Sequence, residues 1–228
     1  GLPVEKNIEI TLYDHATGEV RYNYVHTPDS RNQPDTLFLN PIGKYDIVVH
    51  TFPIVKLNDI ELTPGKHNII GIDVPLGNLI ISEGQSTSFS PKQCVVRDNK
   101  TGEIVYAQNF NTKERYIAGV YDIDILTIPR LHYEDYVIKG GVDNKIDIPL
   151  PGTLNISTTE NKVYSIYLVK EGRLEKVYES SLNASNEMVQ LLPGDDKIFS
   201  RSNIKKYSAN TKDIAVSIKS AKITIIKI

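Results

Sequence analysis

Gly43-Lys44-Tyr45-Asp46-Ile47-Val48-Val49 is the stretch that decides the fold, because it recurs 76 residues later as Gly119-Val120-Tyr121-Asp122-Ile123-Asp124-Ile125. The glycine, the Tyr-Asp-Ile and a following Thr-x-Pro, at residues 51–53 and 127–129, keep the same spacing in both copies. Self-similarity at one fixed period is the sequence signature of repeated structural units. The chain is therefore expected to consist of related modules.

A third, weaker copy runs from Leu192 to Ile198, at an offset near 75 from the second, and Lys197 is expected to replace the tyrosine there. Three copies divide the 228 residues into three predicted modules. Their expected boundaries are residues 1–76, 77–151 and 152–228. The third module is degenerate relative to the other two, so its mode of packing is left open.

Short alternating runs surround a glycine-bearing turn in each module. Asp14 to Val20 matches Asp98 to Ile104, and Lys170 to Leu174 echoes both. Apolar residues at every second position on both sides of such a turn predict a β-hairpin, with the glycine in a left-handed backbone conformation. The sequence predicts strands near residues 7–13, 19–25, 36–40, 44–51, 57–62, 67–73, 78–82, 93–98, 103–109, 114–117, 120–127, 133–138, 144–148, 153–157, 163–169, 173–179, 187–192, 196–200, 212–218 and 222–228.

The composition also favours strands. Ile, Val, Leu and Tyr dominate the apolar residues, whereas Trp is absent and Met occurs once. β-Branched and aromatic side chains suit the half-buried surface of a sheet. Residues 160–181 contain helix formers as well, but Val163, Tyr164 and Gly172 favour strand there. The predicted fold class is all-β, with tandem Ig-like or transthyretin-like antiparallel β-sandwich modules.

Charge and cysteine content exclude several classes of partner and site. The formal net charge is −2, whereas binding to nucleic acid or an anionic membrane usually needs a basic field. No run approaches the roughly 18 apolar residues of a membrane-spanning helix. Cys94 is the single cysteine, so neither an internal disulfide nor a cysteine-based metal cluster can form. We expect its thiol to be buried beside Val96 and not to act as a nucleophile.

The remaining candidate residues form no recognisable catalytic or metal-binding constellation. Carboxylates recur between modules, Asp46 with Asp122 and Asp73 with Asp147, and recurrence favours an architectural role. Alternation places Tyr45 inward and Asp46 outward. The histidines lack the spacing of metal ligands; they are His15, His26, His50, His67 and His132.

No nucleophile elbow, phosphate-binding loop or dinucleotide fingerprint occurs, and Asp195-Asp196 is only a weak candidate for calcium. We therefore expect no catalytic, cofactor-binding or metal-binding residue, and no enzyme activity.

Thirteen tyrosines without a tryptophan leave sugar binding open as an alternative. An aromatic ring on an exposed sheet face can stack on a sugar, although tyrosine packs equally well in cores and interfaces. The tyrosines that this alternative concerns are Tyr22, Tyr24, Tyr106, Tyr116, Tyr133, Tyr136, Tyr164, Tyr167 and Tyr178.

The repeated residues resemble the PEGA-type and carboxypeptidase-regulatory-like (transthyretin-like) β-sandwich repeats of bacterial envelope proteins. They are also similar to the β-rich tail that follows the von Willebrand A domain in some secreted bacterial proteins. The metal-binding Asp-x-Ser-x-Ser of that domain is absent, so such a domain would lie upstream of Gly1. The resemblance rests on Pro41, Gly43, Tyr45, Ile47 and Val49, and on Gly119, Tyr121, Ile123 and Ile125.

This resemblance implies an exported protein, in the periplasm, at the cell surface or secreted. It implies a non-catalytic structural, spacer, adhesion or protein-interaction role. The partner would be another protein or an upstream domain of the same polypeptide. A carbohydrate-binding module and an accessory region of a secreted hydrolase are the alternative functions.

A module of about 75 residues buries only some 60–65% of the surface of its unfolded chain and is marginally stable alone. Adjacent modules are therefore expected to share packing at their junctions. Prolines restrict the two linkers, Val74 to Gly77 and Pro149 to Gly152. The sequence thus predicts a semi-rigid rod.

Overall fold

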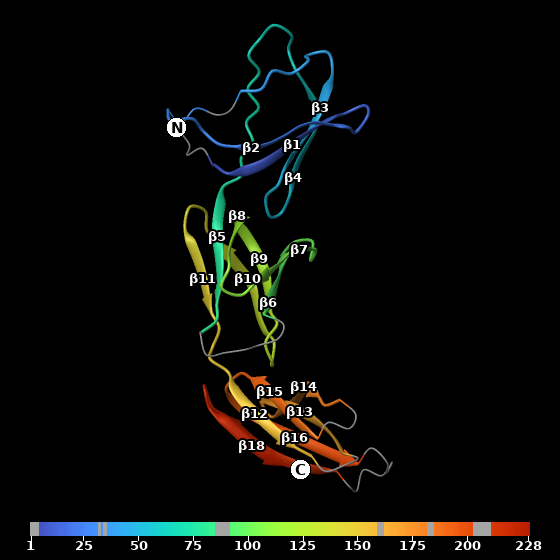
Figure 1. The fold of residues 1–228 in the computed structure, drawn as a ribbon, viewed down its shortest axis with the longest axis vertical. Coiled ribbons are helices and arrows are strands. Elements are labelled where there is room, and N and C mark those ends of the chain that lie inside the picture. Colours follow the sequence, from blue (N-terminus) through green and yellow to red (C-terminus); the bar gives the residue numbers. More distant parts are fainter. Residues whose placement is uncertain are drawn as a thin grey trace.

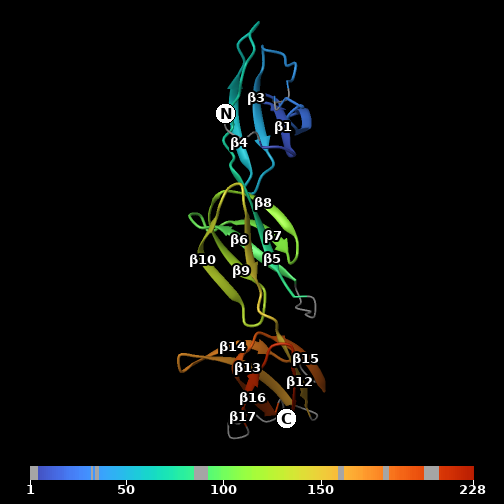
Figure 2. The same ribbon diagram turned by 90° about the vertical axis from the view of Figure 1, so that its left-hand side faces the viewer.

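The computed structural model describes residues 5–31, 33, 36–84, 92–158, 162–181, 185–202 and 211–228, and every regular element within these ranges is a β-strand. Eighteen strands form five sheets in this part of the chain, which confirms the predicted all-β fold. The strands gather in three groups along the long axis of the molecule (Figures 1 and 2). We refer to these groups as modules 1, 2 and 3.

Module 1 contains one four-stranded antiparallel sheet, in the order β2-β1-β3-β4. Its strands are β1 (Ile8–Asp14), β2 (Val20–His26), β3 (Lys44–Val49) and β4 (Val55–Glu61). One face of this sheet carries the buried core of the module, which consists of Ile8, Leu12, Ile47, Val49, Val74 and Leu76.

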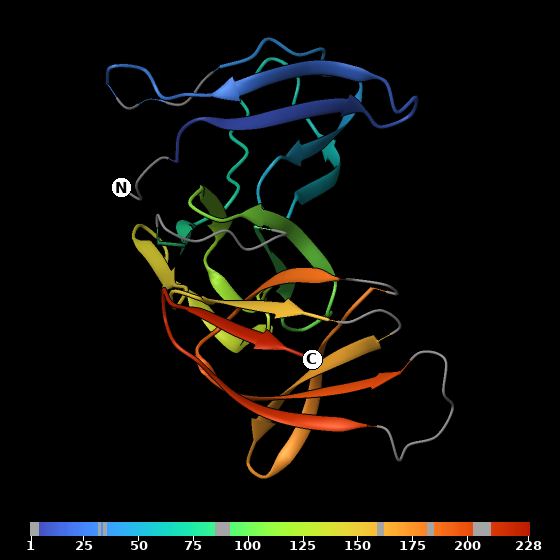
Figure 3. The same ribbon diagram turned by 60° about the horizontal axis from the view of Figure 1, so that its bottom comes forward.

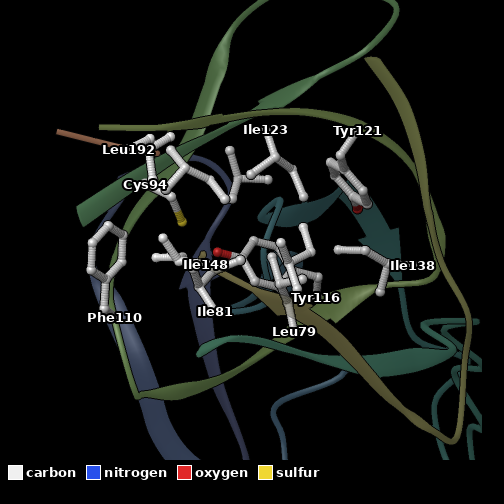
Figure 4. Close-up of a cluster of buried hydrophobic side chains, with 13 residues drawn as sticks. Leu79, Ile81, Cys94, Phe110, Tyr116, Tyr121, Ile123, Ile138, Ile148 and Leu192 are labelled. Atoms are coloured by element: carbon white, nitrogen blue, oxygen red, sulfur yellow. The ribbon is translucent and has the colours of Figure 1, made fainter. Parts of the chain in front are cut away.

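Module 2 is a sandwich of two sheets, a four-stranded one in the order β10-β9-β6-β7 and a three-stranded one in the order β11-β5-β8. Apolar residues of both sheets meet in one buried cluster, in which Cys94 and Tyr116 point into the core (Figure 4). The strands are β5 (Leu76–Ser82), β6 (Gln93–Asp98), β7 (Ile104–Asn109), β8 (Lys113–Ile117), β9 (Gly119–Ile125), β10 (Leu131–Ile138) and β11 (Asp143–Asp147).

Module 3 repeats this sandwich, with the sheets β14-β13-β16-β17 and β15-β12-β18. Strand β18 runs along β12 (Figure 3). The strands are β12 (Gly152–Ser157), β13 (Lys162–Lys170), β14 (Arg173–Glu179), β15 (Asn186–Leu191), β16 (Gly194–Ser202), β17 (Lys212–Ile218) and β18 (Ile223–Lys227).

The sequence predicts purely antiparallel sheets, but two of the sheets also contain a parallel pair of strands. In each three-stranded sheet the first strand of the module is central, with one antiparallel and one parallel neighbour. Strand β5 pairs in parallel with β11, and β12 pairs in parallel with β18. The chain thus closes each module by bringing its last strand back beside its first.

Most predicted strands are confirmed, including the hairpin β13–β14 where helix formers occur. Two predictions in module 1 are wrong, because residues 36–40 and 67–73 form no strand. Their counterparts in module 2 are β8 and β11, which both pair with the central strand β5. An extended segment becomes a strand only when a neighbour accepts its backbone hydrogen bonds. Among the residues described for module 1, no strand takes the place of β5.

The hairpin turns behave as the glycine pattern predicts. Gly18, Gly102 and Gly172 have φ angles of 70°, 71° and 76°, in the left-handed region that glycine enters without a steric penalty. The aspartate that precedes the first two turns stabilises them. The side chain of Asp98, for example, accepts hydrogen bonds from the backbone N–H groups of Lys100 and Thr101.

Candidate functional site

The repeated Tyr-Asp pair lies as the alternation predicts. Tyr45 and Tyr121 are buried, and their hydroxyl groups donate to the backbone carbonyls of Asn40 and Ile117. These bonds tie the four-stranded sheet to the segment opposite it. The repeated tyrosine therefore has the same structural role in module 1 and in module 2.

The repeated aspartates form hydrogen bonds to the backbone of the neighbouring strand. Asp46 accepts a hydrogen bond from the backbone N–H of Asp59 at 2.8 Å, and Asp122 accepts the same bond from Asp135 at 3.0 Å. Asp59 and Asp135 have φ angles of 60° and 53°. They lie in β4 and β10, where the register of pairing with β3 and β9 shifts. The backbone bond, together with His15, lowers the pKa of Asp46. Each carboxylate thus stabilises a strained bulge.

The histidines do not converge on one another. His15 pairs with Asp46 at 2.8 Å and His132 with Asp124 at 2.7 Å, both through Nδ1. Within the ranges that the structure describes, no three His, Cys, Asp or Glu side chains are grouped to hold a metal ion.

The structure separates the side chains of the weak calcium candidate Asp195-Asp196. The two residues are successive in β16, so Asp195 is exposed while Asp196 is buried, and their carboxylates point to opposite faces of the sheet. The register also corrects the expected substitution of tyrosine. Asp196 and not Lys197 takes the buried position of Tyr45 and Tyr121, because Ile198 lies opposite Ile166 as Ile123 lies opposite Val96.

Cys94 is fully buried, as the alternation predicts. Burial raises the pKa of its thiol to about 11. Since the thiolate is the reactive form, this cysteine is a packing residue at neutral pH.

The tyrosines divide between core and surface. Tyr116 and Tyr164 are buried, so these two pack in the core and are not available to a sugar. Tyr167 packs edge-on against Phe199, with 5.1 Å between ring centroids, beside a hollow of about 290 Å³ on module 3. Lys176, Glu179 and Arg201 also line this hollow. An aromatic side chain and charged groups thus lie together at this hollow, and glycan binding there stays a prediction.

The feature with the clearest repeated construction is the joint between modules. At the first joint the ring of Phe52 leaves module 1 and stacks on Tyr106 of module 2, with centroids 4.2 Å apart and an interplanar angle of 19°. The backbone carbonyl of Phe52 accepts a hydrogen bond from the N–H of Ile117 at 2.8 Å. The side chain of Ile117 packs in return against the core of module 1.

The second joint uses the equivalent residues. Ile128 of module 2 packs against the core of module 3, and its backbone carbonyl accepts a hydrogen bond from the N–H of Leu192 at 2.7 Å. Leu192 of module 3 lies in turn in the core cluster of module 2, together with Cys94 and Ile123 (Figure 4). Each joint thus exchanges one apolar side chain in each direction.

The repeated Thr-x-Pro turn holds these side chains in place. Thr51 and Thr127 are buried, and each hydroxyl donates to the carbonyl of the proline two residues on, at 2.7 Å. The residue between the threonine and the proline is Phe52 in the first turn and Ile128 in the second. The turn was visible in the sequence at the offset of 76, but its role was not, because local periodicity does not show which module a side chain enters.

The segment before β1 adds polar contacts to the first joint. The guanidinium of Arg115 donates to the backbone carbonyls of Lys6 and Asn7. The carboxylate of Glu5 accepts a hydrogen bond from the N–H of Leu76 at 3.3 Å. A small hollow of about 230 Å³ lies beside these contacts and is lined by His50, Thr51 and Phe52 among others.

No known protein family matches this sequence, and no curated protein matches it. No helix in the described ranges has the length and apolar character needed to cross a membrane.

Solved structures with some similarity do exist. The chain is similar to the Bacillus anthracis TIE protein, with 16% identity and a TM-score of 0.28, over 99% of this chain and 47% of that one. It is similar to GBS52, the minor pilin of Streptococcus agalactiae, with 13% identity and a TM-score of 0.33, over 67% of this chain and 94% of that one. The pilus adhesin SpaC of Lactobacillus rhamnosus GG shows 9% identity and a TM-score of 0.25, over 98% and 41% of the two chains.

The chain therefore spans about half the length of the TIE protein that it matches. Similarities of this size assign the chain to no family, and its function has to be argued from its own residues.

Proposed function

We propose that this chain is a stiff, non-catalytic spacer and protein-interaction region of an exported bacterial protein. The observation that carries the proposal is the repeated joint. Two joints built from the same parts fix each module on the next, and a stiff row of modules is suited to projecting or separating other domains. The proposed modules are residues 1–76, 77–151 and 152–228.

The exchange of side chains is what makes the joint stiff. Domains linked only by a flexible segment move freely relative to one another, unless a sizeable apolar interface holds them. Here each joint combines buried apolar side chains with a backbone hydrogen bond, as in Ile128 with Leu192. Bending a joint would expose these groups to water and break that bond.

The proposed location is the periplasm, the cell surface or the extracellular medium. It is supported by the resemblance of the repeated residues to modules of bacterial envelope proteins. The buried, unreactive state of Cys94 is compatible with an oxidising compartment, because such a thiol is protected from oxidation.

The joints can be tested by truncating both exchanged side chains, Phe52→Ala with Ile128→Ala. Large-to-small changes at partly buried sites of this kind cost about 2 kcal/mol each. We expect small-angle scattering of the native chain to give the profile of one elongated particle. The double variant should give a broader distribution of dimensions while each module keeps its β-sheet circular dichroism.

Ile54→Ala is the matched control, since Ile54 lies two residues from Phe52 but is exposed. The control should scatter like the native chain. A native profile that already shows a flexible or collapsed particle, unchanged in the double variant, would contradict the proposal.

A further inference from the structure

Module 3 has a hollow of about 290 Å³ on the outer face of its four-stranded sheet, and we propose that this hollow binds an acidic sugar, a saccharide that carries a carboxylate. The hollow lies over β13, β14 and β16, at side chains that alternate with the buried Ile166 and Ile198. A stiff row of modules does not need such a site, so this proposal and the proposed function can fail independently.

The hollow exists because a small side chain is surrounded by larger ones. Ser165 of β13 lies opposite Glu179 of β14 and opposite Phe199 of β16. Tyr167 and Arg201 follow on the same face of the sheet, one on each side of this row. Ser165 therefore forms the floor of the hollow, and the longer side chains form its rim.

The same place in module 2 is closed by an ion pair. Arg97 and Asp124 are the counterparts of Tyr167 and Phe199, and their charged groups lie 3.5 Å apart. In module 3 two partly exposed aromatic rings replace these charges, with planes at 85° to each other. The rings offer two nearly perpendicular apolar surfaces to the C–H groups of a sugar ring, which an ion pair does not.

One positive charge at the hollow is left without a partner. Lys176 donates a hydrogen bond to Glu179 at 2.8 Å, and this contact lowers the pKa of Glu179 and raises the pKa of Lys176. Both groups therefore stay charged at neutral pH and neutralise each other. The guanidinium of Arg201 forms no ion pair with any carboxylate of the described residues. A guanidinium can bind an incoming carboxylate through two parallel hydrogen bonds.

The charge of the whole module also favours an anionic ligand. Residues 152–228 contain 12 Lys and Arg against eight Asp and Glu, whereas residues 1–151 contain 14 against 20. Module 3 is thus a basic region of a chain whose net charge is −2. A basic region attracts anionic ligands and speeds their association.

A sugar fits the remaining groups better than an acidic peptide does. Ligand pockets usually have volumes of about 300–1,000 Å³, so a hollow at the lower end of this range suits a single ring. The hydroxyl of Ser165 and the carboxylate of Glu179 can bond to the hydroxyl groups of a sugar, while Arg201 binds its carboxylate. An acidic peptide has no such ring, and its carboxylates would be repelled by Glu179.

The test follows the binding of small sugars to the whole chain by chemical-shift titration in NMR. The probes are sialyllactose and trigalacturonate, each with a neutral counterpart, lactose and the methyl ester of trigalacturonate. We expect saturable binding of at least one acidic sugar, and binding of its neutral counterpart that is at least tenfold weaker. No saturable binding of either acidic sugar, or equally strong binding of a hexaglutamate peptide, would overturn the proposal.

Two sets of variants separate a built site from general attraction to a basic surface. Arg201→Gln should weaken binding at least tenfold, and Arg173→Gln is its matched control, since Arg173 is exposed in the same module and lies outside the hollow. Tyr167→Arg with Phe199→Asp copies the residues of module 2 and leaves the net charge unchanged. This double variant should keep its β-sheet circular dichroism and also bind at least tenfold more weakly. Equal loss in the two arginine variants, or full binding by the double variant, would contradict the proposal.

Discussion

Replacing Gly152 with alanine is expected to lower the free energy of unfolding of module 3 by about 3 kcal/mol. A Cβ atom at this position would lie 2.5 Å from the carbonyl oxygen of Lys219 and 2.7 Å from Cγ2 of Ile218. Both distances are shorter than van der Waals contact, and one of the atoms belongs to the backbone. The first strand of the module would have to move away from the strands it closes against.

The glycine is repeated for the same reason in module 2. A Cβ at Gly77 would clash with the carbonyl of Lys139, so Gly77→Ala should have a similar effect there. Gly43→Ala is the matched control, because a Cβ at Gly43 meets nothing within 4 Å and its φ is not in the left-handed region. Urea denaturation followed by circular dichroism provides the measurement. A Gly152→Ala chain as stable as the Gly43→Ala chain would show that the close approach is not obligatory.

Replacing Asp196 with asparagine is expected to stabilise module 3 by about 3 kcal/mol at pH 8. The side chain is 2% exposed, and neither carboxylate oxygen has a hydrogen-bond partner among the described residues. Burial, with a smaller contribution from the charge of Asp195, raises its pKa from 3.8 to about 6. At roughly 1.4 kcal/mol per pKa unit, the ionised form destabilises the folded state by about 3 kcal/mol.

The sign of the pH dependence follows from this raised pKa. Between about pH 4 and pH 6 the folded state holds a proton that the unfolded state has released, so Asp196 makes stability fall as the pH rises through this window. The cost is absent below about pH 4 and complete above pH 6. The stability gained by Asp196→Asn should therefore vanish on acidification.

Asp195→Asn is the control for the Asp196 variant, since Asp195 is the exposed neighbour. Its stability should equal that of the native chain at pH 4 and exceed it at pH 8 by much less than that of Asp196→Asn, because the charge of Asp195 makes only the smaller contribution to the raised pKa of Asp196. Urea titrations at the two pH values make the comparison. If Asp196→Asn changed stability equally at both, ionisation of this carboxylate would not be the cause.

Much of the fold could be predicted because it depends on local alternation. Tyr45 and Tyr121 lie inward and Cys94 is buried, as period-two patterns require. The same rule also explains the error at Asp196. A shift of one residue in the alignment of the third copy moves every side chain to the other face of the sheet. Such a shift assigns Lys197 to the buried position that Asp196 occupies.

Features that depend on distant partners could not be predicted in this way. Residues 36–40 and 67–73 have the pattern of strands, but pairing needs a central strand that the pattern does not supply. The same holds for the joints. Phe52 and Ile128 look like ordinary apolar residues after a strand, and only the three-dimensional arrangement shows that each packs in the next module.

The stiffness of the row of modules is tested most directly by a distance between its ends. Spin labels on cysteines that replace Lys56 of β4 and Glu175 of β14, both exposed, report the separation of modules 1 and 3 by double electron–electron resonance. Cys94 stays unlabelled because it is buried. The proposed stiffness predicts one narrow distance distribution, which broadens when Phe52 and Ile128 are truncated to alanine. A distribution that is already broad in the chain with both joints intact would contradict it.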